Sequence, residues 1–115
     1  MNLMNAEVSL SDPSRRYNDT CFVENLEERN CFSYIDNDGN PCRMNVYDDG
    51  ICLLRKCPDH LLELHLREEG YALITTEEGS CKINVKMVDM VANGDILVLH
   101  YLVEDDERII KIKYC

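Results

Sequence analysis

The sequence predicts an all-β protein, a single closed antiparallel up-and-down barrel of about eight strands. Apolar and polar residues alternate along several segments, most clearly at residues 81–87, where Cys, Ile, Val and Met alternate with Lys, Asn and Lys. Successive side chains of a strand point to opposite faces, so each such segment has one apolar and one polar face. Short turns separate the segments, and closure into a barrel would hide every apolar face and leave no free edge.

The turns are marked by pairs of residues that adopt tight hairpin geometry easily. Asp38-Gly39 is the strongest of these signals, because Asp-Gly tolerates a positive φ, and Asp49-Gly50 and Asn93-Gly94 have the same form. Between such signals we expect strands at residues 20–25, 31–35, 42–47, 51–56, 71–75, 80–87, 96–103 and 109–114.

Residues 59–69 fit two interpretations. Asp59 could cap a helix that Gly70 ends, and the intervening Leu, Glu and Arg residues favour helix. The alternation of Leu62, Leu64 and Leu66 with polar residues favours a strand, which is the interpretation adopted. Between residues 87 and 90 the apolar positions shift by one residue, as a β-bulge would cause.

The chain is expected to form one domain. Its first part, residues 1–16, is an N-terminal segment in which Glu7–Leu10 could form a short first strand before Pro13 interrupts it. Residues 17–115 form the barrel domain. A chain of 115 residues with 45% hydrophobic side chains can bury one core without further support.

Charge and cysteine content narrow the classes of function. The formal net charge of -10 repels phosphates, so neither nucleic acid nor an anionic membrane is expected as a partner. The seven cysteines are widely spaced, odd in number and without a Cys-x-x-Cys pair, which indicates reduced thiols in a cytoplasm. We see neither a signal peptide nor an apolar run of the roughly 18 residues that cross a membrane.

Four short motifs, in a fixed order, connect the chain to a known family. They lie at residues 50–55 (GICLLR), 71–79 (YALITTEEG), 96–101 (ILVLHY) and 110–114 (IKIKY). In order and spacing, the stretch Asp49–Tyr114 resembles the YwiB-like family of small bacterial proteins, a domain-of-unknown-function family. The resemblance implies an eight-stranded barrel of the calycin, lipocalin-like type, with no established activity.

Three polar residues are candidates for binding a ligand inside the barrel. Arg55 and Tyr101 match positions of the family pattern, and an inward Arg beside a Tyr could hold a carboxylate, because Arg presents a rigid fork of donors. Arg55 could instead pair with one of the many acidic side chains at its strand end. His100, which interrupts an apolar strand, is the third candidate, with a structural role as the alternative.

No metal, cofactor or catalytic group is expected. His60 and His65 are five residues apart and would point to opposite faces of one strand, so Cys57, Asp59 and these histidines do not make a zinc site. The Asp36-x-Asp38-x-Asn40 pattern resembles a calcium loop, but Pro41 replaces the required glycine, so we interpret it as a hairpin turn. Nucleophile, base and orienting group do not occur in a recognisable pattern, so an enzyme is not expected.

Two functional hypotheses remain. In the first, the barrel binds a small apolar or amphipathic ligand in its lumen, because about eight strands is the size that can hold one such molecule. In the second, a barrel with a filled core acts as an interaction or regulatory module. Its interface would be the second apolar face of the strand at 96–103, formed by Ile96, Val98 and Leu102, and a homodimer is one expected outcome.

Overall fold

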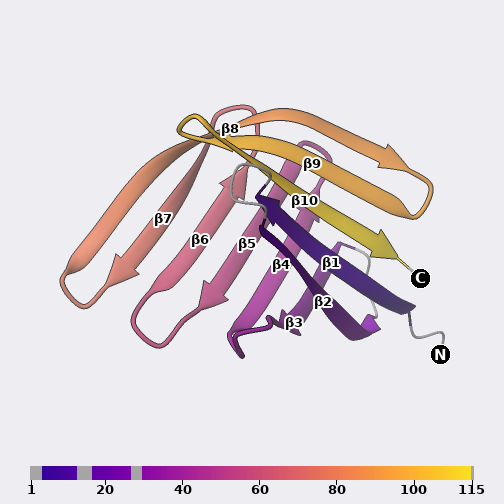
Figure 1. The fold of residues 1–115 in the computed structure, drawn as a ribbon, viewed down its shortest axis with the longest axis horizontal. Helices are drawn as coiled ribbons and strands as arrows, with labels where there is room; N and C mark the ends of the chain where they lie inside the picture. Colours follow the sequence, from indigo (N-terminus) through magenta and orange to yellow (C-terminus); the bar gives the residue numbers. More distant parts are fainter. Residues whose placement is uncertain (1–3, 13–16, 27–29, 115) are drawn as a thin grey trace.

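The computed structural model describes the backbone of residues 4–12, 17–26 and 30–114, and the side chains of residues 6–11 and 30–114. These residues form ten strands in one antiparallel sheet (Figure 1). The strands are β1 (Met4–Asp12), β2 (Tyr17–Leu26), β3 (Cys31–Ile35), β4 (Pro41–Tyr47), β5 (Gly50–Lys56), β6 (Leu61–Leu66), β7 (Gly70–Thr76), β8 (Gly79–Asn93), β9 (Ile96–Val103) and β10 (Asp106–Tyr114). The described part of the chain contains no helix that is long and apolar enough to cross a membrane.

The strand order is β2-β1-β10-β9-β8-β7-β6-β5-β4-β3. Neighbours along the chain are therefore neighbours in the sheet from β3 to β10, which confirms the expected antiparallel up-and-down connectivity. The first strand is longer than expected and lies between β2 and β10, paired with both. Because residues 4–26 supply two full strands, the sheet has more strands than the expected number.

The expected closure of the barrel is wrong, because the sheet is open. Its two edges are β2 and β3, which lie against one another but do not pair as neighbouring strands of the sheet. Alternating apolar residues require only that the inner face be covered. Here a strongly curled sheet covers that face by bending over itself, so strands β10, β1 and β2 cross over strands β3 to β5 (Figure 1).

The core lies between these two parts of the curled sheet. Phe32 on β3 meets Tyr114 on β10 edge to face, with 6.5 Å between the ring centroids, although the two strands lie far apart in the sheet order. The inner face of the curl is buried by residues that follow the predicted alternation. They are Ala6, Val8, Phe32, Tyr34, Cys42, Met44, Ile51, Leu53, Leu64, Leu66, Ala72, Val85, Leu97, Leu99, Tyr101, Ile110, Ile112 and Tyr114.

The two uncertain segments of the sequence have clear structures. Residues 61–66 form strand β6, with Leu64 and Leu66 buried, so the two-residue alternation prevails over helix propensity. Strand β8 continues well past the point where the alternation shifts. The expected β-bulge lies between Met87 and Asp89, and the extra residue, Val88, is 52% exposed. One inserted residue lets Met87 and Met90 face the same side of the sheet.

The glycines at the turns have different roles. Gly39 has a φ of 85°, as the Asp-Gly signal predicts. Gly50 does not have a positive φ and begins β5. A Cβ atom at Gly50 would lie 1.7 Å from the carbonyl oxygen of Leu66, so this position requires glycine for the close approach of two strands and not for turn geometry.

Candidate functional site

The curled sheet leaves a partly open cavity of about 600 Å³ on its inner face. Its wall is mainly aliphatic, with four polar residues at intervals. The lining residues are Leu10, Ser11, Leu53, Arg55, Leu62, Leu64, Ala72, Ile74, Ile83, Tyr101, Val103 and Arg108. This volume falls within the range of roughly 300–1,000 Å³ that is usual for small-molecule sites, and so does the combination of apolar walls with a few polar groups.

The alternation of each strand determines which polar side chains reach the cavity. Arg55 follows the buried Ile51 and Leu53 on the inner face of β5, and Tyr101 follows Leu97 and Leu99 on β9 in the same way. The structure therefore brings together two of the three candidates, both of which line the cavity. Arg55 lies opposite Cys42 on β4 and Leu62 on β6.

Arg55 also forms the ion pair that its alternative interpretation proposed. Its Nε lies 3.3 Å from Oδ2 of Asp36, and the Asp36 side chain is only 5% exposed whereas that of Arg55 is 24% exposed. Burial lowers the pKa of Arg55, but the Cys42 thiol and the negative charge of Asp36 more than offset this effect, and the net pKa is raised. The guanidinium is therefore charged at every physiological pH.

Asp36 is held by the turn between β3 and β4. Its Oδ1 accepts hydrogen bonds from the backbone amides of Asp38 (3.0 Å) and Asn40 (2.8 Å), and its Oδ2 accepts one from Nδ2 of Asn40 (3.1 Å). These bonds are those of a hairpin turn, in agreement with the interpretation of the Asp36-x-Asp38-x-Asn40 pattern. They also fix the carboxylate where Arg55 reaches it.

Cys42 lies beside Arg55 and is buried. Burial raises the pKa of its thiol, and this effect exceeds the opposing effect of the hydrogen bond and positive charge of Arg55. Its Sγ donates to the backbone carbonyl of Asn40 at 3.5 Å. Since the thiolate is the nucleophilic form, a thiol with a raised pKa is a packing residue at neutral pH.

Tyr101 is almost fully buried. Burial raises the pKa of its hydroxyl to about 12, although the positive charge of Arg55 acts in the opposite direction. The hydroxyl is therefore neutral at physiological pH and can donate a hydrogen bond. The same result shows that Tyr101 lies within the electrostatic field of Arg55.

Arg108 is a cavity residue that the sequence reasoning missed. It lies directly opposite Tyr101 in the pairing of β9 with β10, and its side chain is 21% exposed. Its Nη2 is 3.9 Å from Oδ2 of Asp106, a half-exposed carboxylate outside the cavity lining. The final strand was expected to begin at Ile109, but it begins at Asp106, and the alternation of Ile110, Ile112 and Tyr114 continued backward would have placed Arg108 inside.

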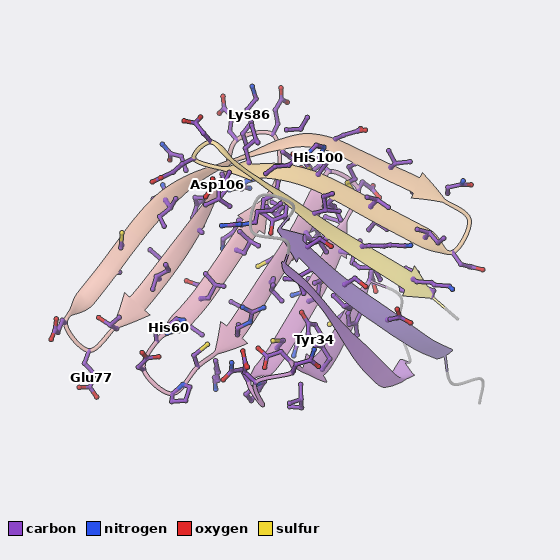
Figure 2. All side chains as sticks on the ribbon, in the orientation of Figure 1. Tyr34, His60, Glu77, Lys86, His100 and Asp106 are labelled. Carbon is purple, nitrogen blue, oxygen red and sulfur yellow. The ribbon has the colours of Figure 1, made fainter. Side chains whose placement is uncertain are left out.

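His100 lies on the outer face of β9, away from Arg55 and Tyr101. Its Nε2 is 2.5 Å from Oε1 of Glu107, and both side chains are partly exposed. His60, at the β5–β6 turn, pairs with the adjacent Asp59 at 2.7 Å, and Figure 2 shows it well away from His100. No group of three or more metal-binding side chains occurs among the described residues.

The three residues of the predicted interface also lie on the outer face. Ile96, Val98 and Leu102 alternate with the buried Leu97, Leu99 and Tyr101, and each is half-buried. Val98 lies between Val91 on β8 and Lys111 on β10, and Val91 is 49% exposed. The outer face here is therefore apolar where Val91 lies opposite Val98 and charged at Lys111 on β10.

Comparisons with known proteins give one structural similarity. No protein-family model matches the chain, and no curated protein matches it. Among solved structures, the chain is similar to the crystal structure of the ywiB protein from Bacillus subtilis, with a TM-score of 0.39 and 10% sequence identity. That alignment covers 96% of this chain and 87% of the other.

Proposed function

We propose that this protein binds one small amphipathic molecule in the cavity of its curled sheet, and that it acts by binding and not by catalysis. The observation that carries the proposal is the composition of the cavity wall. Among the residues whose side chains are described, eight aliphatic or alanine side chains and Tyr101 surround a space of about 600 Å³, and the charged residues Arg55 and Arg108 also line it. Such a wall suits a ligand with an apolar part and a polar end.

The chemistry of the wall also favours binding over catalysis. Cys42, next to Arg55, has a raised thiol pKa because it is buried, and Tyr101 keeps its proton to about pH 12 for the same reason. A nucleophile or general base needs a pKa near the working pH, and neither group has one. Tyr101 therefore supplies packing and hydrogen bonding to a bound molecule, whereas Cys42 does not line the cavity and packs beside Arg55.

The first experiment is native mass spectrometry with decanoate as the probe. We expect one decanoate bound per chain, retained under native conditions and lost in a denaturing run. Ile83→Trp, which fills the cavity from β8, should abolish the adduct, while Val91→Trp adds the same bulk on the outer face of the same strand and should not. Circular dichroism would show that both variants fold.

Two results would contradict the proposal. One is the absence of a decanoate adduct in the wild-type protein, and the other is equal binding by the two tryptophan variants, which would place the molecule outside the cavity. A second candidate function, self-association through the outer face, is favoured by the exposure of Val91 beside Val98. A dimer in the same spectrum would support that function.

We also propose a cytoplasmic location and membership of the YwiB-like family, with a fold of the calycin, lipocalin-like type. The location rests on free thiols, since Cys31, Cys42, Cys52, Cys57 and Cys81 are all unpaired in the described chain. The family membership rests on the four motifs between Asp49 and Tyr114.

A further inference from the structure

Strand β8 has a free edge along its second half. Residues 79–85 of β8 pair with β7 and residues 85–93 pair with β9, so beyond Val85 no strand of the described chain pairs with β8 on the β7 side. Among the described residues, the last backbone hydrogen bond on that side runs from the amide of Met87 to the carbonyl of Arg67, at 3.3 Å. This half of β8 lies along the rim of the molecule (Figure 1).

The turn between β8 and β9 determines which backbone groups point out of this edge. It spans residues 94–95 and begins with a glycine at a φ of 60°, which suits a two-residue hairpin. Such a turn closes on a pair that exchanges both backbone hydrogen bonds, here Asn93 and Ile96, and bonded and non-bonded pairs then alternate along the ladder. The amide and carbonyl groups of Ala92 and Met90 therefore point away from β9, out of the free edge.

The side chains of this edge are apolar and exposed. Four large apolar side chains are exposed among the residues whose side chains are described, and two of them, Val88 (52%) and Val91 (49%), lie here. The first half of β8, residues 79–84, is free on the β9 side, and its exposed side chains include Lys82 and Asn84. Lysine on a strand edge opposes pairing with another chain, whereas an exposed apolar edge favours it. The second half of β8 is therefore the edge that suits a partner strand.

This edge also differs in charge from the rest of the chain. Residues 86–93 contain one cation, Lys86, and one anion, Asp89, so their formal charge is zero in a chain whose formal net charge is -10. Two copies of an acidic protein repel each other over most of their surface. The repulsion is least where one neutral edge meets another.

We propose that β8 pairs with β8 of a second copy of this chain along residues 88–93, antiparallel and about a two-fold axis, so that two curled sheets join into one. A second copy supplies a strand that is already extended, whereas a flexible peptide would lose conformational entropy on binding. The contact is made by backbone groups at a strand edge and not by the outer face of the sheet. It is independent of the cavity and adds a partner to the proposed ligand-binding function.

The register of the pairing follows from the backbone directions. Met90 and Ala92 point outward, so Met90 of each copy exchanges both hydrogen bonds with the partner's Ala92. This register sets Val91 against its own copy and places Asp89 opposite the partner's Asn93, whose amide can donate to the carboxylate. The two Asp89 carboxylates therefore do not face each other.

The dimer is expected to dissociate on dilution. Two short strand edges bury less area than the roughly 1,200 Å² at which stable complexes begin. We expect a dissociation constant of about 10–100 µM, so the protein is mainly monomeric when dilute and mainly dimeric when concentrated.

Hydrogen exchange of individual amides, measured at about 10 µM and about 1 mM protein, tests the pairing directly. We expect the amides of Met90 and Ala92 to exchange about four- to eightfold more slowly at the higher concentration, because only the dimer bonds them. The amide of Val91 bonds to β9 in monomer and dimer alike, so it is the internal control and should not respond to concentration.

Two proline variants extend the test. Ala92→Pro removes an amide that points out of the free edge and leaves the hydrogen bonds to β9 in place. Ser80→Pro is the matched control on the polar half of β8, because the two-residue turn at 77–78 directs the Ser80 amide away from β7. In sedimentation velocity at about 300 µM, we expect the wild type and Ser80→Pro to be mainly dimers and Ala92→Pro to be a monomer. Circular dichroism would show that both variants fold.

Four results would overturn the proposal, and each leaves the ligand-binding function standing. A wild type that is monomeric at about 1 mM would exclude a second copy as the partner. Exchange of the Met90 and Ala92 amides that does not depend on concentration would exclude pairing at this edge, whether or not the proline variants fold. A dimer that persists in folded Ala92→Pro would place the interface on the outer face. Loss of the dimer in folded Ser80→Pro alone would place it on the other half of β8.

Discussion

Asp36 and Arg55 form an ion pair that neither residue's local sequence reveals. The carboxylate is fixed by three hydrogen bonds within its own turn, and the guanidinium comes from β5, two strands along the sheet. Because a buried carboxylate needs a counter-charge, the pair sets both the position of Arg55 and the charge that the cavity presents. The turn between β3 and β4 therefore contributes to the electrostatics of the site.

Tyr101 gives the structure a predicted weakness at alkaline pH. Its pKa is raised to about 12 in the folded state by burial and is 10.0 when unperturbed, so the folded state holds the proton more tightly than the unfolded state does. This contribution to stability is fully present below about pH 10 and is lost as the pH rises from about 10 to 12. A pKa difference of about two units corresponds to roughly 2–3 kcal/mol.

The measurement is the free energy of unfolding by urea at about pH 9 and about pH 12, with a reducing agent present. Tyr101→Phe should lose roughly 2–3 kcal/mol less than the wild type over this range, because it has no hydroxyl to ionise. Tyr47→Phe, at an exposed position, is the control. The thiol of Cys42 also has a raised pKa, so its ionisation destabilises the folded state above its unperturbed pKa of 9.0. This loss occurs in the wild type and in Tyr101→Phe alike, so the difference between the two proteins reports on Tyr101. Equal losses in wild type and Tyr101→Phe would contradict the account.

At the scale of elements, the long strand β8 keeps its apolar side chains on the inner face of the sheet on both sides of a β-bulge. Val88 is an extra residue, and without it Met90 would face the solvent side. The strand continues for fifteen residues and pairs with β7 in its first half and with β9 in its second half. A bulge increases local twist, and this one lies within the part of β8 that pairs with β9.

The approach of β5 to β6 depends on Gly50. We expect Gly50→Ala to lower the free energy of unfolding by about 3 kcal/mol or more, because its Cβ would collide with the backbone of Leu66 and a backbone atom cannot rotate away. Gly39→Ala is the matched comparison: it meets no atom within 4 Å, and only its positive φ of 85° opposes it, at a cost of about 1–2 kcal/mol.

Urea denaturation of both glycine variants tests this difference. If Gly39→Ala were as damaging as Gly50→Ala, turn geometry and not strand approach would determine the role of Gly50. The sequence alone would suggest that outcome, because both glycines follow an aspartate. The distinction comes from the backbone of Leu66, which the chain brings back to Gly50 through the β5–β6 hairpin.

At the scale of the whole molecule, alternation of apolar and polar residues predicts most of the fold. It identifies the strands at residues 31–35 and 96–103 without error, favours strand over helix for β6, and locates the bulge in β8. It cannot predict whether the edges pair. The inner face is equally well buried whether β2 and β3 form hydrogen bonds or only lie against each other, so closure depends on long-range geometry that the pattern does not contain.

The lack of long-range geometry in the pattern also explains which residues of the cavity the sequence predicts and which it misses. Arg55 and Tyr101 were candidates because they match positions of the family pattern, and the structure places each two positions beyond a core leucine, Leu53 or Leu99, on its own strand. Arg108 was missed because the start of its strand was expected three residues too late. Asp36 appeared as an ordinary turn carboxylate, and its burial arises only when β5 is placed beside β4.

The central claim is that an amphipathic molecule binds inside the curl, and methyl-labelled NMR during a decanoate titration tests it most directly. We predict saturable shifts of the methyl signals of Leu53, Leu62, Leu64, Ile74 and Ile83, which line the cavity. Ile35, Val91 and Val98, on the outer face, should not move. Shifts confined to Val91 and Val98 would contradict the claim, because they would place the binding surface on the outside of the sheet.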